Sequence, residues 1–203
     1  MTLLWKGRDF GMNCLESRIA ADGVVLPGNI LKVDSFLNHQ IDVKLLREMG
    51  REFYELFKDK QKDINKILTV EASGIAIACY VAEQFDCPLV FAKKGQHKNV
   101  GPDVLTAEVF SFTKGQTYEI AVSSKYIAPG DRILIIDDFL ANGQAVLGLD
   151  SICKEAGAVV EGAGIAVTKA FQQGEQLLKD AGIDVRSLAV IESMDGGVIK
   201  FRQ

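Results

Sequence analysis

The sequence contains five short apolar stretches, rich in Val and Ile, that are separated by segments long enough to form helices. They are residues 66–70, 88–92, 132–137, 161–169 and 185–193. Continuous apolar runs of this length are typical of strands that are buried on both faces, as in a parallel sheet. Helix-length segments at 74–85, 143–157 and 174–182 lie among them, and the last two end at a Gly. This alternation predicts right-handed βαβ units and a doubly wound α/β fold.

Two parts of the chain depart from this alternation. Residues 104–112 and 116–124 are separated by Thr-Lys-Gly, which predicts a β-hairpin inserted into the α/β order. The preceding segment 93–103, KKGQHKNVGPD, is polar and basic, so we expect a loop there. Nearer the start, apolar and polar residues alternate over 24–42, but the pattern predicts no clear helix or strand. An amphipathic helix is expected over 43–59.

Composition and charge narrow the class of protein. The 203 residues are 48% hydrophobic and 25% charged, and no repeat or linker divides them, which favours one domain over 1–203. The net charge of −4 gives no general electrostatic reason to expect a nucleic-acid or membrane partner. The apolar runs are shorter than the roughly 20 residues of a membrane-spanning helix. Four scattered cysteines and two histidines predict reduced thiols in the cytoplasm and no His-rich metal site.

The segment ILIIDDFLANGQA, residues 133–145, carries the strongest functional signal. An apolar strand runs into Asp137 and Asp138, and a helix is expected to begin near Gly143. Backbone N–H groups at a helix start favour a phosphate, whereas two carboxylates are suited to accept hydrogen bonds from sugar hydroxyls. The pattern therefore indicates a ligand that carries both groups, a ribose 5-phosphate. The structural alternative is that Asp137 caps the helix and Asp138 faces solvent.

This strand, acid pair and small-residue loop resemble the motif with which type I phosphoribosyltransferases bind 5-phosphoribosyl 1-diphosphate (PRPP). DDFLANGQA, together with LKVDSFLNHQID at residues 31–42, is similar to the xanthine phosphoribosyltransferases in particular. The resemblance extends from Met12 over nearly the whole chain, and residues 1–11 look like an upstream extension. It implies a central, mostly parallel sheet flanked by helices, with a flexible hairpin insertion and a small hood from 24–42 and 169–203.

The resemblance also implies an activity and the residues that bind PRPP. The enzyme would transfer the phosphoribosyl group of PRPP to xanthine, with Mg²⁺ bound mainly through PRPP and with a homodimer as the assembly. The residues that match the 5-phosphate loop are Ala141, Asn142, Gly143, Gln144 and Ala145, and those that match the diphosphate loop are Glu71, Ala72, Ser73 and Gly74. Asp137 and Asp138 match the acids that hold the ribose hydroxyls. Lys93 and Lys94 open the basic loop, which in relatives closes over the site.

Four further residues match the part of the family site that holds the purine. Leu31 and Asn38 match base-contacting positions, Lys169 matches a lysine that faces a purine oxygen, and Phe171 is placed to stack on the ring. Lys169 is expected to act in catalysis together with Asp137 and Asp138. The structural alternatives are core packing for Leu31, a cap for Asn38 and a surface position for Lys169.

One departure from the family pattern concerns the first residue of the phosphate loop. Hypoxanthine–guanine relatives have an Asp there that is thought to assist at the purine, whereas this chain has Ala141. Catalysis would therefore rely on stabilising the leaving group and the cation-like pentose centre. Two alternatives stay open at this stage. The enzyme could use another purine (guanine, hypoxanthine or adenine), or the fold could serve a PRPP-sensing regulator.

Overall fold

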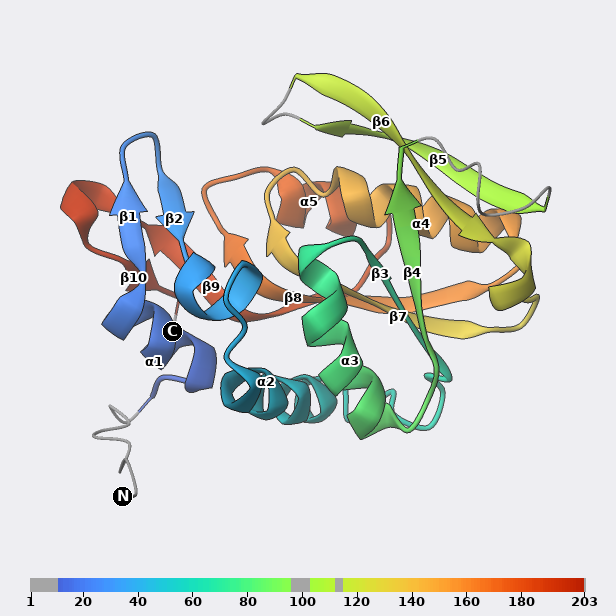
Figure 1. The fold of residues 1–203 in the computed structure, drawn as a ribbon, viewed down its shortest axis with the longest axis horizontal. Coiled ribbons are helices and arrows are strands. Elements are labelled where there is room, and N and C mark those ends of the chain that lie inside the picture. Colours follow the sequence, from blue (N-terminus) through green and yellow to red (C-terminus); the bar gives the residue numbers. More distant parts are fainter. Residues whose placement is uncertain (1–10, 96–102, 112–114, 203) are drawn as a thin grey trace.

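The structure, a computed structural model, describes residues 11–95, 103–111 and 115–202. Its centre is an eight-stranded mixed sheet in the order β10-β9-β8-β7-β3-β4-β6-β5 (Figure 1). The strands are β3 (Lys66–Val70), β4 (Leu89–Lys94), β5 (Val104–Ser111), β6 (Gln116–Ser123), β7 (Arg132–Leu140), β8 (Val159–Lys169), β9 (Val185–Ser193) and β10 (Lys200–Phe201). The helices that accompany them are α1 (Cys14–Asp22), α2 (Val43–Leu56), α3 (Ser73–Phe85), α4 (Gln144–Glu155) and α5 (Gly174–Asp180).

The five predicted strands form the parallel part of this sheet. β9, β8, β7, β3 and β4 are neighbours in that order, and each of the four pairs is parallel. The predicted bounds of β3 and β9 are confirmed. The other three strands extend beyond the predicted bounds, because sheet pairing continues past the apolar run that marks a strand in the sequence. The largest difference is in β7, which continues through both aspartates to Leu140.

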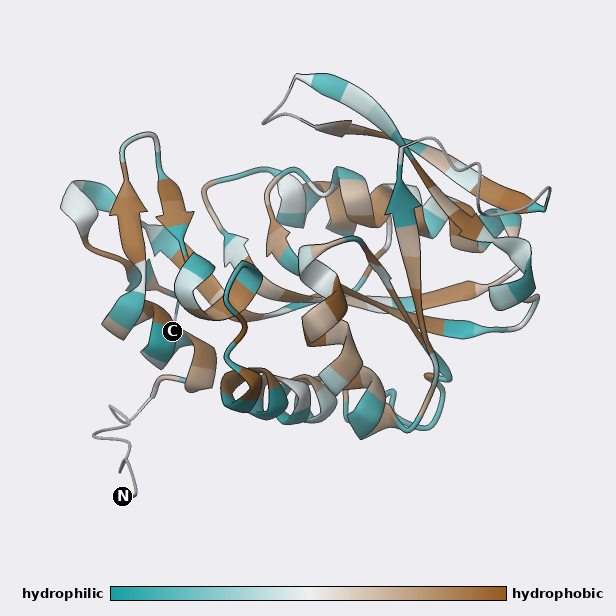
Figure 2. Cartoon of the chain, viewed as in Figure 1, coloured by the Kyte–Doolittle hydropathy of each residue, from teal (hydrophilic) through white to brown (hydrophobic). Residues whose placement is uncertain are grey.

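Helices cover both faces of the sheet, and each face has its own apolar cluster. Ile67 and Leu134 pack with residues of α2 and α3, whereas their neighbours Leu68 and Ile135 pack with residues of α4 and α5. This division follows from the strand geometry, since successive side chains point to opposite faces. It also explains why the strands are continuously apolar (Figure 2). The predicted helices are confirmed; α3 ends at its predicted limit, Phe85, whereas α2, α4 and α5 end two or three residues earlier than predicted.

The predicted hairpin is confirmed as β5 and β6. They pair antiparallel along their whole length, and β6 also pairs antiparallel with the end of β4, which places the hairpin at one edge of the sheet. On its inner side, Val109 and Ile120 are buried with residues of α4. The turn residues 112–114 and most of the expected basic loop, residues 96–102, lie outside the described part of the chain.

Helix α1 was not predicted, and neither were several shorter elements. β1 (Val24–Leu26) and β2 (Ile30–Lys32) form a separate two-stranded sheet, and a π-helix follows at Asp34–Asn38. β10 adds two residues to the edge of β9. Each of these strands is only two or three residues long, which is too short for an alternation of apolar and polar residues to be recognised. Figure 1 shows the β1–β2 hairpin beside the C-terminal part of the chain. Among the described residues, no helix has the length and apolar character needed to cross a membrane.

Candidate functional site

The two predicted PRPP-binding loops follow adjacent strands of the sheet. β3 leads into residues 71–74 and β7 leads into residues 141–145, and the two strands pair in parallel from Lys66 opposite Ile133. From this pair the chain winds outward in both directions, through β4 on one side and through β8 and β9 on the other. Ligands of doubly wound sheets bind at such a reversal, outside the carboxyl ends of the strands. The fold therefore brings the two loops to one edge of the sheet.

Asp137 and Asp138 lie within β7 and not beyond its end. Asp137 is 9% exposed, Asp138 is half-buried, and the Asp138 amide donates a hydrogen bond to Asp137 Oδ1 at 3.0 Å. Because they are successive strand residues, their side chains leave the sheet on opposite sides. The structural alternative, that Asp137 caps the helix, does not hold, because the N-cap of α4 is Gly143.

Burial gives the Asp137 carboxyl an unusual protonation equilibrium. Its pKa is raised well above the ordinary value, mainly because burial disfavours the charged form and also because the charge of Asp138 is close. The amide of Asp138 and the ammonium of Lys94 act in the opposite direction. The site thus holds a carboxyl group whose ionised form is costly until a hydrogen-bond donor or a cation approaches.

The predicted phosphate loop has the geometry of an anion cradle. Gly143 has φ of 72°, a left-handed conformation that side chains other than Gly rarely adopt, and it is the N-cap from which α4 begins. All five loop residues line a cleft of about 140 Å³ together with Asp137 and Tyr118. The unpaired N–H groups of the first helical turn therefore open beside this cleft, where they favour a phosphate.

Gly174, which the sequence analysis did not single out, supports this loop. The Gly174 amide donates a hydrogen bond to the Ala141 carbonyl at 3.0 Å, and Gly174 is buried at the start of α5. A Cβ atom at Gly174 would overlap the Ala141 carbonyl oxygen. Only its position as a Gly at the start of the predicted helix 174–182 could have drawn attention to it in the sequence.

The predicted diphosphate loop connects β3 to α3. Its Glu71–Ala72 peptide bond is cis, and the Glu71 carboxylate accepts a hydrogen bond of 2.6 Å from the Lys94 amide. The N-cap of α3 is Ala72, without a side-chain hydrogen bond, and Ser73 is the first helical residue. Ser73 therefore does not cap α3. Lys93 and Lys94 end β4 and have exposed side chains; the Lys94 amide contacts this loop, whereas Lys93 lines a separate pocket with Phe91 and Ala121.

The predicted purine-binding residues lie in two parts of the chain: Lys169 and Phe171 at and just after the end of β8, and Leu31 and Asn38 in β2 and the π-helix. Lys169 ends β8, and its ammonium donates to the backbone carbonyl of Asn29, in the β1–β2 turn, at 2.9 Å. Partial burial lowers the pKa of Lys169. Phe171 follows it and is 43% exposed. Leu31 belongs to the core, as in its structural alternative, and Asn38 is the exposed last residue of the π-helix.

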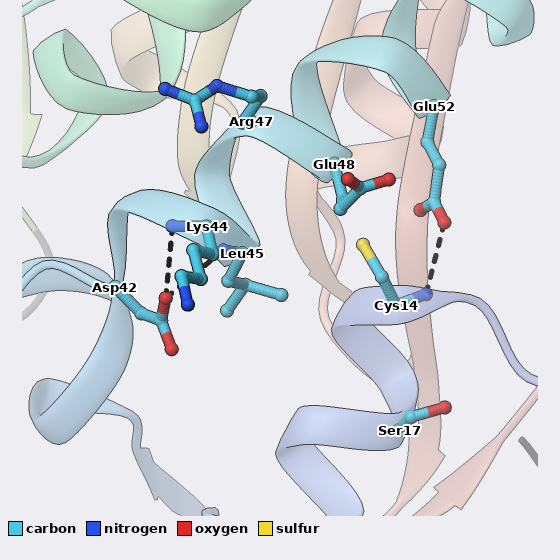
Figure 3. Close-up of a pocket in the computed structure, with 8 residues that line it drawn as sticks. All are labelled: Cys14, Ser17, Asp42, Lys44, Leu45, Arg47, Glu48 and Glu52. Carbon is cyan, nitrogen blue, oxygen red and sulfur yellow. Dashed lines mark hydrogen bonds between the residues drawn. The ribbon is translucent and has the colours of Figure 1, made fainter. Parts of the chain in front are cut away.

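A separate cavity of about 480 Å³ lies between α1 and α2, and none of the predicted site residues lines it (Figure 3). Glu52 accepts a hydrogen bond of 3.1 Å from the Cys14 amide there. Burial, followed by the charges of Glu52 and Glu48, raises the pKa of the Cys14 thiol. A thiol held in its neutral form is a poor nucleophile, so this cavity does not form a cysteine-based active site.

The pattern of the phosphoribosyl transferase domain family matches residues 33–202, which include every predicted site residue except Leu31. The chain belongs to this family. Several xanthine phosphoribosyltransferases are also similar to this chain in sequence. The xanthine phosphoribosyltransferase of Ruminiclostridium cellulolyticum is 55% identical over 95% of this chain and 100% of that protein. The one from Clostridioides difficile is 53% identical over 94% and 100% of the two chains.

Solved structures of the family share the fold. The adenine phosphoribosyltransferase from Rhodothermus marinus superposes with a TM-score of 0.69 at 23% identity, covering 87% of this chain and 97% of that one. APRTase from Giardia lamblia gives 0.72 at 18% identity, covering 88% and 97%. At these identities the likeness concerns the fold alone, and it confirms the predicted α/β phosphoribosyltransferase architecture.

The buried carboxyl of Asp137 makes the stability of the protein depend on pH. Because its pKa is raised, the folded state binds more protons than the unfolded state at any pH between the ordinary pKa of Asp and the raised one. The free energy of unfolding therefore falls as the pH rises through that range. Asp137→Asn should increase the free energy of unfolding at pH 7 by about 1 kcal/mol. The gain should shrink towards pH 4. Urea titrations at both pH values measure it, with the exposed Asp195→Asn as control; a variant less stable at pH 7 contradicts the prediction.

Gly174→Ala should weaken PRPP binding while the protein stays folded. The added methyl group displaces the Ala141 carbonyl and with it the phosphate loop. We expect the dissociation constant for Mg-PRPP to rise about ten-fold, because small displacements in a binding loop are costly. Isothermal titration calorimetry measures it, and Gln176→Ala on the exposed side of the same helix is the matched control. Equal affinities for both variants would show that the loop does not depend on this contact.

Proposed function

We propose that this protein is a purine salvage enzyme that transfers the 5-phosphoribosyl group of PRPP to xanthine, giving xanthosine 5′-monophosphate and pyrophosphate. The observation that carries the proposal is the 55% identity to a named xanthine phosphoribosyltransferase over that protein's whole length. The geometry supports it independently, since the predicted phosphate and diphosphate loops follow two paired parallel strands. A site for one ligand with phosphates at both ends needs such an arrangement.

The roles that we propose for PRPP binding follow from the chemistry of each group. The amides of 141–145 and the start of α4 hold the 5-phosphate, and Asp137 and Asp138 accept hydrogen bonds from the ribose hydroxyls. Loop 71–74 and the ammonium groups of Lys93 and Lys94 face the diphosphate. In the reaction the bond from C1′ to the diphosphate oxygen breaks, a purine nitrogen forms the new bond to C1′, and that nitrogen loses its proton.

The transition state of this reaction is cation-like at C1′, with negative charge growing on the leaving diphosphate. Fixed donors and cations around the leaving group lower its energy, and ionised Asp137 and Asp138 lie beside the positive sugar. Ala141 offers no carboxylate at the purine, so the nearby Lys169 ammonium is the polar group that we assign to the base.

Mg²⁺ is the cofactor that we propose, brought in with PRPP. Carboxylates are the hard oxygen donors that Mg²⁺ prefers; Asp137 offers one at the cleft, and Asp138 is the next residue of β7. Among the described residues no group of three or more His, Cys, Asp or Glu could hold a metal ion. We propose that substrate oxygens coordinate most of the ion. When bound, the ion neutralises charge on the diphosphate.

For xanthine recognition we propose Lys169, Asn38, Leu31 and Phe171, with residues 24–42 and 169–203 as a hood over the base. The hydrogen bond from Lys169 to the Asn29 carbonyl supports the hood, because it joins these two segments next to the cleft. A purine carbonyl could replace the Asn29 carbonyl as the acceptor of this ammonium. Phe171 is exposed enough to stack on a ring, whereas Leu31 would act through packing.

The remaining proposals concern the setting of the enzyme. We propose that it works as a homodimer in the cytoplasm, which is what the family resemblance implies, and without nucleic-acid or membrane partners. The four cysteines are all free, as expected in a reducing compartment. Residues 1–203 are proposed to form one domain, with 1–11 as an extension.

The experiment that tests the function is spectrophotometric turnover of each purine with Mg-PRPP. We expect xanthosine monophosphate and pyrophosphate from xanthine, with lower kcat/KM for guanine and hypoxanthine and none for adenine, which has no carbonyl oxygen for Lys169. Product from adenine alone would replace the substrate but keep the enzyme class. Binding of PRPP without turnover of any purine would favour the PRPP-sensing regulator.

Lys169→Met should raise the KM for xanthine about ten-fold or more and leave the KM for PRPP within about two-fold, the loss expected when a charged hydrogen bond disappears. Met keeps the length of the side chain, so the ammonium alone is tested. Lys32→Met, on the exposed side of β2, controls for loss of a hairpin charge. If both KM values rise equally, Lys169 only holds the hairpin to the sheet.

A further inference from the structure

Tyr118 is the one tyrosine at the PRPP cleft among the described residues, and no role was assigned to it above. It belongs to β6, in the inserted hairpin, and it lines the cleft together with Asp137 and the phosphate loop. The hairpin reaches this place because β6 pairs with β4 and because Val109 and Ile120 are buried with residues of α4. Tyr118 is half-buried, so its ring is partly enclosed while one side stays open.

The ring of Tyr118 holds the side chain of Lys94. The Lys94 ammonium lies 5.3 Å from the ring centroid, within the range of a cation–π contact. The backbone of the same residue donates to the Glu71 carboxylate at 2.6 Å. Lys94 is therefore attached at two points, through its amide to the diphosphate loop and through its ammonium to the hairpin.

The charge of Lys94 is available to an anionic ligand. In the described part of the chain its ammonium makes no ion pair with a carboxylate, although Asp137 is close enough for the two charges to interact. The pKa of Tyr118 is raised, first by burial and then by the charge of Asp137, so its ring stays neutral. A neutral aromatic face orients an ammonium without neutralising it, which an acidic side chain in this position would do.

We propose that Tyr118 is a positioning residue that holds the Lys94 ammonium at the diphosphate end of the PRPP cleft. The inference rests on the proposed function, because it takes the cleft to bind PRPP. A free lysine side chain has rotamer entropy that an anionic ligand must overcome on binding, and a ring contact made beforehand reduces this cost. Tyr118 acts through Lys94 and not on the reacting atoms.

The test compares Tyr118→Phe, which keeps the ring, with Tyr118→Leu, which removes it. Tyr118→Leu should raise the dissociation constant and the KM for Mg-PRPP about two- to five-fold, the range of a partly exposed cation–π contact. The KM for xanthine should not change, and Tyr118→Phe should behave like the unaltered protein. Tyr126→Leu, an exposed tyrosine just after β6, is the matched control.

A double-mutant cycle decides whether Tyr118 acts through Lys94. In a Lys94→Met background, Tyr118→Leu should have no further effect on PRPP binding, since the ammonium that the ring would hold is gone. Additive effects, or a Phe variant as weak as the Leu variant, would overturn the proposal. Calorimetry with Mg-PRPP alone keeps the two proposals separate. If the protein binds PRPP but does not turn over xanthine, the proposed function is wrong, and the effect of Tyr118 on PRPP binding can still be measured.

Discussion

The parallel pairing of β3 with β7 is the constraint on which the rest of the site depends. It joins strands that are far apart in the chain, Lys66 opposite Ile133, and it lies where the winding of the sheet reverses. At a reversal the two loops that follow the strands leave in different directions, and a crevice opens between them. We propose that one loop faces the diphosphate end of the ligand and that the other faces the 5-phosphate. A register shift of one residue would turn both strands' apolar residues to the wrong helix layer.

Around this pair, the site keeps charges that work against folding. Asp137 is buried near Asp138, and its pKa is raised because the ionised form is poorly solvated. The nearby Lys94 ammonium lowers that cost, and it is also the group that we propose for the anionic diphosphate of the ligand. In this cleft neither the negative charge of Asp137 nor the positive charge of Lys94 is fully neutralised. Such a cleft is suited to a ligand that carries hydroxyl donors, anionic phosphates and an accompanying cation. Stability and ligand binding thus place opposite demands on the same residues, as is common at active sites.

Two hairpins lie towards opposite ends of the sheet, and we propose that they complete the cleft. β5 and β6 bring Tyr118 to Lys94 at the diphosphate side. β1 and β2 lie at the other side, where the Asn29 carbonyl accepts the hydrogen bond of Lys169. The central strands thus fix where the ligand lies, and the hairpins supply the side chains through which we propose that PRPP and the purine are recognised. The family fold can keep its phosphate loops while the purine changes, because the two tasks belong to different elements.

The sequence alone determined the parallel strands, the covering helices, the inserted hairpin and the loops of the site, because these depend on local patterns: apolar runs, helix ends and the small-residue loop after the acid pair. It placed the end of β7 too early, because the pairing with β8 continues through polar residues that carry no apolar signal. It also missed the contacts from Gly174 to Ala141 and from Lys94 to Tyr118. Each of these joins residues more than twenty positions apart, and only the packing of the sheet with its helices and hairpins decides which distant side chains meet.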